Sequence, residues 1–212
     1  MRRLVILRPE PGASATARRA RELGLEAERH PLFAMEAVAW TMPDGAFDGL
    51  LLTSANAVRQ AGRLPTLPVH AVGDATAAAA RDAGAEVVTV GRGGIDALLA
   101  ALPAGLRLLH LAGEDRIAPA APRQQIIPVT VYRAAPLPLP EPEAFAGKVL
   151  LVHSPAAGRR LAEFDGNRRG IRIAAISDAA ALACGEGWAA CLSAERPEDG
   201  ALLSLAAKLC KD

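Results

Sequence analysis

The chain has 212 residues, of which 51% are hydrophobic and 22% are charged, and its formal net charge at pH 7 is +1. This near-neutral balance lacks the basic field that attracts nucleic acid, and a 3% share of aromatic residues leaves few side chains on which bases stack. We therefore expect no nucleic-acid partner, no membrane span, and either one large domain or two small ones.

The beginning of the chain, MRRLVILRPEPG, contains a short apolar run that breaks at Arg8-Pro9. This pattern favours a first strand over a signal peptide. Three cysteines, Cys184, Cys191 and Cys210, lack the spacing of metal ligands, so we expect buried free thiols. These features predict a cytoplasmic protein in a reducing compartment, without a metal site.

The amino-terminal elements are predicted from apolar runs and from residues that begin or end helices. Residues 4–7 are expected to form a strand, followed by a helix that Ser14 caps and that runs to Leu23. Residues 25–40 hold extended pieces around Pro31. We interpret them as an irregular crossing segment.

A strand-to-helix switch at Ser54 organises the next part of the chain. Residues 50–52 form an apolar run typical of a strand buried on both faces, and residues 55–61 are compatible with a helix. Ser54 is expected to cap this helix, because its oxygen accepts a hydrogen bond from a free backbone N–H. Another strand follows at residues 69–72, and Asp74 is expected to cap the helix after it.

The same pattern returns at residues 148–160, where Ser154 takes the place of Ser54, and Asp178 later takes the place of Asp74. Because the register persists over four elements, we interpret the two runs as similar α/β units. A chance likeness between two Ala- and Leu-rich runs is the alternative.

Strands that alternate with short helices predict mainly parallel, doubly wound sheets. The fold class is therefore α/β, with two similar flavodoxin-like domains joined by a two-stranded linker. The carboxyl-terminal run has too few strands for a full sheet, so the first strand and helix are expected to complete it. We predict one domain from residues 1–34 and 136–212, and an inserted domain from residues 35–135. A simple sequential split is the alternative.

Candidate binding residues follow from the strand ends. In an open α/β sheet a ligand binds beyond the carboxyl ends of the strands, where helix N-termini offer backbone N–H groups to an anion. The residues expected at these ends, as candidates to bind a ligand, are Arg8, Ser54, Asn56, Gly73, Thr76, Gly113, Ser154 and Ser177. Several such turns together would bind a polyanion, whereas any one of these serines by itself is better explained as a helix cap.

Few other groups suggest chemistry. No dinucleotide or phosphate-loop motif occurs, and four scattered histidines give no ligand spacing, so no cofactor is expected. Tyr132 is the only tyrosine and ends an extended run. A phenol is protonated at neutral pH, so Tyr132 is a candidate proton donor; packing is the alternative.

Several segments resemble the uroporphyrinogen-III synthase family. They are Arg8-Pro9, DGLLLTSANAV at residues 48–58, VGDATA at 72–77, Val131-Tyr132, LLVHSPAAGRR and AERPEDGALLSLAAKL. Each motif is short, and the resemblance depends on their order and spacing over nearly the whole chain.

The resemblance implies a cofactor-free lyase of tetrapyrrole synthesis, which closes the linear hydroxymethylbilane with its last ring inverted. It implies two α/β domains joined by a two-stranded ladder, and a monomer is expected. Tyr132 matches the tyrosine of the family and becomes the candidate general acid. Ala179-Ala180 departs from the threonine often found there, and residues 116–127 are short and proline-rich, which puts contacts of Arg116 in doubt.

Two other functions are alternatives. A non-catalytic two-domain protein that binds a small polyanion would need the same amide-rich turns. A receiver-like regulatory module would need a clustered acidic pocket with a lysine at the strand ends, and the few lysines are badly placed for it.

Overall fold

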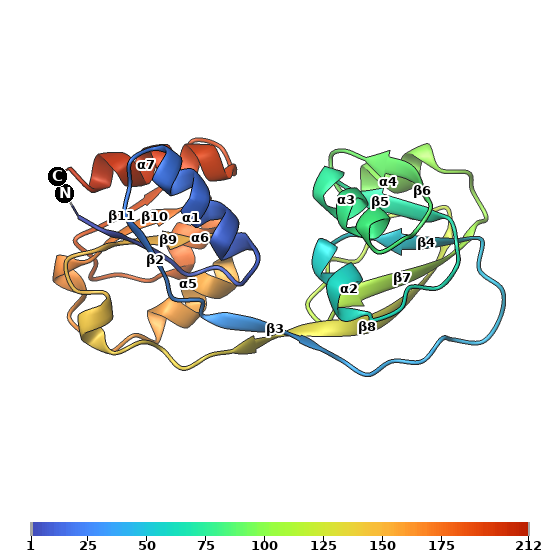
Figure 1. The fold of residues 1–212 in the computed structure, drawn as a ribbon, viewed down its shortest axis with the longest axis horizontal. Helices are drawn as coiled ribbons and strands as arrows, with labels where there is room; N and C mark the ends of the chain where they lie inside the picture. The colour runs from blue at the N-terminus through green and yellow to red at the C-terminus, as the bar shows by residue number, and fades with distance from the viewer. Residues whose placement is uncertain (1, 212) are drawn as a thin grey trace. The chain divides into compact units, whose positions relative to one another are not determined.

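The computed structural model describes residues 2–211 and divides into two compact units (Figure 1). Unit 1 consists of Met1–Ala34 with Pro136–Asp212, and unit 2 of Met35–Ala135. The chain passes from unit 1 to unit 2 within β3 (Phe33–Ala37) and returns within β8 (Gln125–Pro136), and these two strands are neighbours in one sheet. Unit 1 is thus built from two separate parts of the chain.

Unit 1 contains a five-stranded parallel sheet in the order β11-β10-β9-β1-β2. Its strands are β1 (Leu4–Ile6), β2 (Ala27–Arg29), β9 (Val149–Val152), β10 (Arg172–Ala175) and β11 (Ala190–Ser193). Its helices are α1 (Gly12–Glu22), α5 (Pro155–Ala162), α6 (Asp178–Ala183) and α7 (Asp199–Leu209), with short 3-10 turns at Pro142–Ala144 and Arg168–Gly170.

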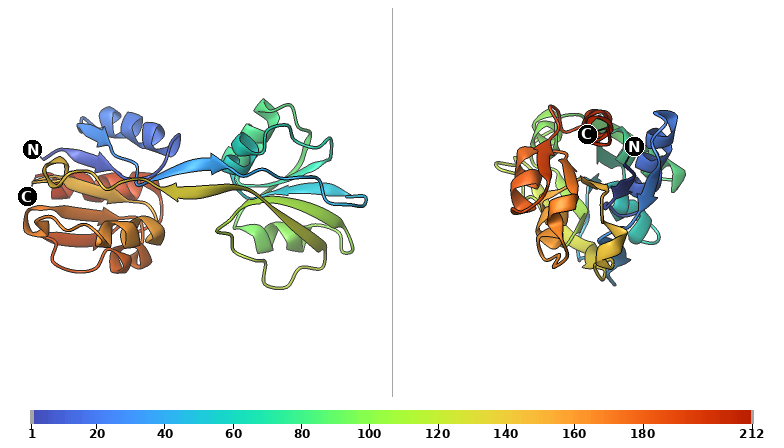
Figure 2. Two further views of the ribbon diagram at one scale, coloured as in Figure 1. Left: turned by 90° about the horizontal axis from the view of Figure 1, so that it is seen from below. Right: turned by 90° about the vertical axis from the view of Figure 1, so that its left-hand side faces the viewer.

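Helices cover both faces of this sheet (Figure 2). On one face α1 and α7 pack through Ala20 and Leu203 into the cluster that contains Leu4 of β1. On the other face α5 and α6 pack into the cluster that contains Leu161 and Val5. Successive residues of β1 therefore enter opposite cores, which explains why this strand is apolar throughout.

Unit 2 contains a six-stranded sheet in the order β3-β8-β7-β4-β5-β6, in which β4 to β8 pair in parallel. Besides β3 and β8, its strands are β4 (Gly49–Leu52), β5 (Val69–Val72), β6 (Val87–Gly91) and β7 (Arg107–Gly113). Its helices are α2 (Ala55–Gln60), α3 (Asp74–Asp82) and α4 (Ile95–Ala101). α2 and α3 pack on one face and α4 on the other, where Leu98 meets Leu51.

The two units share one arrangement of five parallel strands, but the chain begins at a different strand of that arrangement in each unit. β4-β5-β6 and β9-β10-β11 are adjacent in the same order, and beside β4 lie β7 and β8 where β1 and β2 lie beside β9. Unit 2 has no counterpart of α1. In unit 1 this helix joins β1 to β2, whereas in unit 2 residues 114–124 join β7 to β8 without a helix. This relationship explains why the sequence repeat covers only part of each unit.

Two predicted helix starts were wrong. α1 begins at Gly12, and the Ser14 N–H is capped from outside the helix by the Glu10 carboxylate, 2.9 Å away. α3 begins at Asp74 itself, after Gly73, whose φ of 81° favours glycine. Asp74 is exposed instead and forms an ion pair with Arg92 at 3.6 Å.

The predicted fold class is confirmed, because both sheets are dominated by parallel strands and are flanked by helices. Within residues 2–211, none of the helices has the length and apolar character that crossing a membrane requires.

Candidate functional site

The strand order reverses once in each sheet, and such switch points are where open α/β sheets bind ligands. In unit 1 the reversal lies between β1 and β9, and in unit 2 it lies between β4 and β7. Arg8 and Ser154 follow the two strands of the first switch point, and Ser54 and Gly113 belong to the strand ends of the second. Four predicted residues thus flank the positions that topology selects.

Three predicted serines act as helix caps. Ser54 accepts a hydrogen bond from the Asn56 N–H at 3.1 Å, and Ser154 accepts one from the Ala157 N–H at the same distance. Ser177 caps α6 through the Ala180 N–H at 3.3 Å. Each of these hydroxyl oxygens already accepts a hydrogen bond from the helix that it caps. An anion could therefore bind only to the other N–H groups of the first turn, which have no partner within the helix.

The other predicted residues of unit 2 are placed differently. Gly73 provides the turn before α3, and the Thr76 side chain is buried within that helix's packing face, at 5% exposure. The carboxamide oxygen of Asn56 accepts a hydrogen bond from Arg59 at 3.3 Å. At the carboxyl ends of the strands of unit 2, Gly73 and Thr76 therefore offer a ligand their backbone groups rather than side chains.

Tyr132 and Gly113 are brought together by an irregularity in the sheet. The register between β7 and β8 shifts after Ala112, so that Gly113 pairs with Tyr132. A Cβ atom on Gly113 would lie 2.8 Å from Cζ and 2.9 Å from the hydroxyl oxygen of Tyr132. The phenol therefore lies across Gly113, at the carboxyl end of β7.

A cation and a neutral imidazole accompany this tyrosine. The Arg116 guanidinium donates to the Gly113 carbonyl at 3.3 Å and to the Thr130 hydroxyl at 3.1 Å. His110 lies 3.1 Å from the Thr53 hydroxyl, and burial together with the charge of Arg116 lowers the pKa of His110 to about 4. Arg116 thus places a positive charge beside Tyr132, and the imidazole of His110 is uncharged at neutral pH.

The edge of unit 1 holds a cluster around Asp199, the first residue of α7. Its carboxylate accepts hydrogen bonds from Arg19 at 2.7 Å, from Thr16 at 2.9 Å and from His153 at 3.0 Å, and Arg8 lies 3.8 Å away. Burial opposes ionisation, but the bonds from His153, Arg19 and Thr16 outweigh it and hold the pKa of Asp199 below its usual range.

One carboxylate faces two guanidinium groups in this cluster, so positive charge is in excess at the end of β1. The Arg8 guanidinium also lies against Gly12, where a Cβ atom would come within 2.5 Å of Nε. The arrangement can bind a carboxylate of a ligand through donors of Arg8 and Arg19 that Asp199 does not use.

Sequence reasoning missed Asp199, His153 and Thr16 as members of this edge. Thr16 and Asp199 are 183 positions apart, so no local pattern joins them. The available signal was the position of His153, which immediately precedes the capping Ser154.

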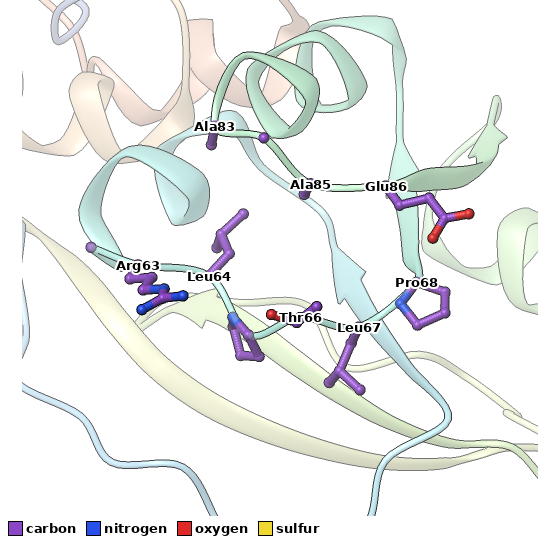
Figure 3. Close-up of a pocket in the computed structure, with 11 residues that line it drawn as sticks. Arg63, Leu64, Thr66, Leu67, Pro68, Ala83, Ala85 and Glu86 are labelled. Carbon is purple, nitrogen blue, oxygen red and sulfur yellow. The ribbon is translucent and has the colours of Figure 1, made fainter.

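The surface of the described residues contains several hollows. One of about 410 Å³ is formed by residues 62–68 and 83–86, which precede β5 and β6, at the amino ends of the strands (Figure 3). Leu64 points toward Ala83 and Ala85 there, while the Glu86 carboxylate points away. Another, of about 730 Å³, lies beside α6 and β11. Among the described side chains, no three of His, Cys, Asp or Glu are grouped to hold a metal ion.

Comparison with known proteins decides the family. The model of the family described as uroporphyrinogen-III synthase HemD matches residues 14–204. The chain belongs to the uroporphyrinogen-III synthase family. It is therefore an enzyme of tetrapyrrole synthesis, in the branch that leads to porphyrins and heme. A search of the curated proteins finds no significant match.

A solved uroporphyrinogen-III synthase shares the fold at low sequence identity. The enzyme of Helicobacter pylori is 17% identical with a TM-score of 0.69, over 99% of this chain and 100% of that chain. A mutant enzyme of the extremely thermophilic bacterium Thermus thermophilus is 19% identical with a TM-score of 0.49, over the same shares of both chains. Only the first of these two likenesses supports the fold.

Proposed function

We propose that the chain is a hydro-lyase that cyclises hydroxymethylbilane, with inversion of the last pyrrole ring and loss of water, to uroporphyrinogen III. The family match over residues 14–204 is the observation that carries this proposal. We also propose that residues 1–34 with 136–212 and residues 35–135 act as separate domains, because each has its own sheet and buried clusters.

The charges at both edges suit this substrate, which carries several carboxylates. Arg8 and Arg19 in unit 1 and Arg116 in unit 2 offer guanidinium donors, and the helices capped by Ser54, Ser154 and Ser177 offer backbone N–H groups. We assign substrate contacts to these groups and to the backbone at Gly73, Thr76 and Asn56.

Tyr132 is assigned as the general acid. The hydroxyl of the substrate leaves as water once the phenol has given it a proton, and the electron pair of the C–O bond departs with that oxygen. A pyrrole nitrogen stabilises the resulting cation, and the last ring attacks it through the carbon that already joins this ring to the chain, which forms a spiro intermediate. The older bond at that carbon then breaks, the inverted ring closes through its free carbon, and the proton lost on closure restores the phenol. Gly113 supports this role, because the absence of its side chain makes room for the ring of Tyr132.

The test is to supply hydroxymethylbilane to the purified chain and to separate the product isomers. We expect the type III isomer, with turnover slowed about a hundredfold in Tyr132→Phe. Formation of only the type I isomer, as occurs without enzyme, would refute the synthase activity. An unchanged rate in Tyr132→Phe would refute only the role of Tyr132.

The alternative is a non-catalytic protein that binds a small polyanion, since the same Arg and N–H groups would serve it. That protein would be stabilised thermally by the bilane without any increase in product. The isomer assay and a thermal shift with the same substrate therefore separate the two functions.

A further inference from the structure

Cys184 and Cys191 form a pair of neighbouring thiols in unit 1, away from the Asp199 cluster. Cys184 ends α6, and Cys191 lies in the edge strand β11. The Cys184 thiol donates to the Ala180 carbonyl at 3.2 Å, and the Cys191 thiol approaches the Ala181 carbonyl at 3.6 Å. Because these carbonyls belong to consecutive residues of α6, both thiols lie at the same turn of that helix, close enough for each to influence the ionisation of the other.

The two thiols are unequal. The expectation that every cysteine is buried is wrong for Cys191, which is partly exposed because β11 has a neighbour on one side only, whereas Cys184 is fully buried. The neighbouring Cys191 and burial raise the pKa of Cys184, whereas the neighbouring Cys184 lowers the pKa of Cys191. An accessible thiol of lowered pKa beside a second thiol is the arrangement of reactive cysteine pairs.

Cys191 is reached through the hollow of about 730 Å³ beside α6 and β11. Asp178 and Glu186 line this hollow together with the exposed Leu182. The two carboxylates disfavour the approach of an anionic small thiol, whereas a neutral oxidant such as a hydroperoxide is not repelled.

We propose that Cys191 is a peroxide-reactive cysteine and that Cys184 resolves it into a disulfide within the chain. The Cys191 thiolate attacks one oxygen of the hydroperoxide, the O–O bond breaks, and the other oxygen leaves and is protonated to water or an alcohol. The Cys184 sulfur then attacks the resulting sulfenic acid, the S–O bond breaks, and water leaves with the proton of Cys184. Two thiols are oxidised by two electrons, and one peroxide is reduced.

The experiment treats the reduced, full-length protein with hydrogen peroxide and then counts free thiols in denaturant. We expect the count to fall from three to one, with a mass loss of two hydrogen atoms and a peptide map that joins Cys184 to Cys191. A reductant should restore all three thiols. An unchanged count, or a bridge to Cys210, would overturn the proposal.

Three variants assign the roles of the individual cysteines. Cys184→Ser should stop at a sulfenic acid on Cys191 that a dimedone-type reagent traps, and Cys191→Ser should lose the reaction with peroxide. Cys210→Ser is the matched control and should form the disulfide at the wild-type rate. Trapping of Cys184 rather than Cys191 in the single variants would contradict the assignment. Because the wild-type peptide map decides the pairing, the test survives poor folding of a variant.

Discussion

In unit 1 the Nε2 atom of His153 donates a hydrogen bond of 3.0 Å to Oδ1 of Asp199, and neither side chain is more than 14% exposed. The same carboxylate also fixes Thr16 and Arg19 on α1. Asp199 therefore connects α7, α1 and the end of β9 at the switch point of the sheet.

Replacement of Asp199 by Asn should destabilise the protein by about 2 kcal/mol, because hydrogen bonds to a charged group are lost around a nearly buried position. Chemical denaturation monitored by circular dichroism measures the change. Asp74→Asn is the control, since Asp74 also begins a helix but its side chain is 77% exposed, and we expect a change within about 0.5 kcal/mol. Equal effects of the two substitutions would contradict a special role for the Asp199 cluster.

His110 should make stability depend on pH. Its pKa in the folded protein is about 4, below the ordinary value of 6.5, so the unfolded chain binds a proton more readily. Stability is therefore fully present above about pH 6.5 and is lost as the pH falls toward 4, by at most about 3 kcal/mol.

The measurement is the free energy of unfolding of the wild type and of His110→Gln across this pH range. Their difference should change steadily between the two values, because the contributions of all other groups cancel. A difference that does not vary with pH would show that His110 does not titrate in this way.

Gly113→Ala tests the placement of Tyr132. The new methyl group would collide with the phenol, so we expect Tyr132 to move and turnover of hydroxymethylbilane to fall about a hundredfold. Gly200→Ala is the control, because no atom lies within 4 Å of the Cβ position there. Full activity of Gly113→Ala would mean that the ring is not required in its present position.

Gln124 should stabilise unit 2 by capping a helix end. Its Nε2 atom donates to the carbonyls of Leu99, Leu102 and Pro103 at 3.1, 3.2 and 2.8 Å, at the end of α4. Gln124→Ala leaves these acceptors without this donor and should cost about 1 to 3 kcal/mol in the free energy of unfolding. The neighbouring Gln125 is exposed, and its substitution by Ala should have almost no effect.

Local patterns were sufficient for much of the fold. Apolar runs such as residues 50–52 predicted the buried strands, and serine at Ser54 and Ser154 predicted the helix starts, because both signals are contained in a few adjacent residues. The prediction was wrong at Asp74 because the turn needs a positive φ, which Gly73 supplies. An acidic residue close to a helix start does not reveal which residue makes the turn.

The candidate site was less accessible from sequence. Tyr132 was found as the only tyrosine of the chain, but its position over Gly113 depends on a register shift between two strands. The Asp199 cluster joins residues from α1, β9 and α7, which only the completed sheet of unit 1 brings together. Partners so distant along the chain leave no periodic signal.

The chain order of the two units sets a sequence of events during synthesis. All strands of unit 2 lie within one uninterrupted run of the chain, from β3 to β8, whereas in unit 1 Leu4 of β1 pairs with Val149 of β9. A ribosome therefore releases β1, α1 and β2 long before their partner strand has been translated. The inserted unit is free to fold first, and the amino-terminal segment waits, with its apolar strand uncovered, until the last third of the protein emerges.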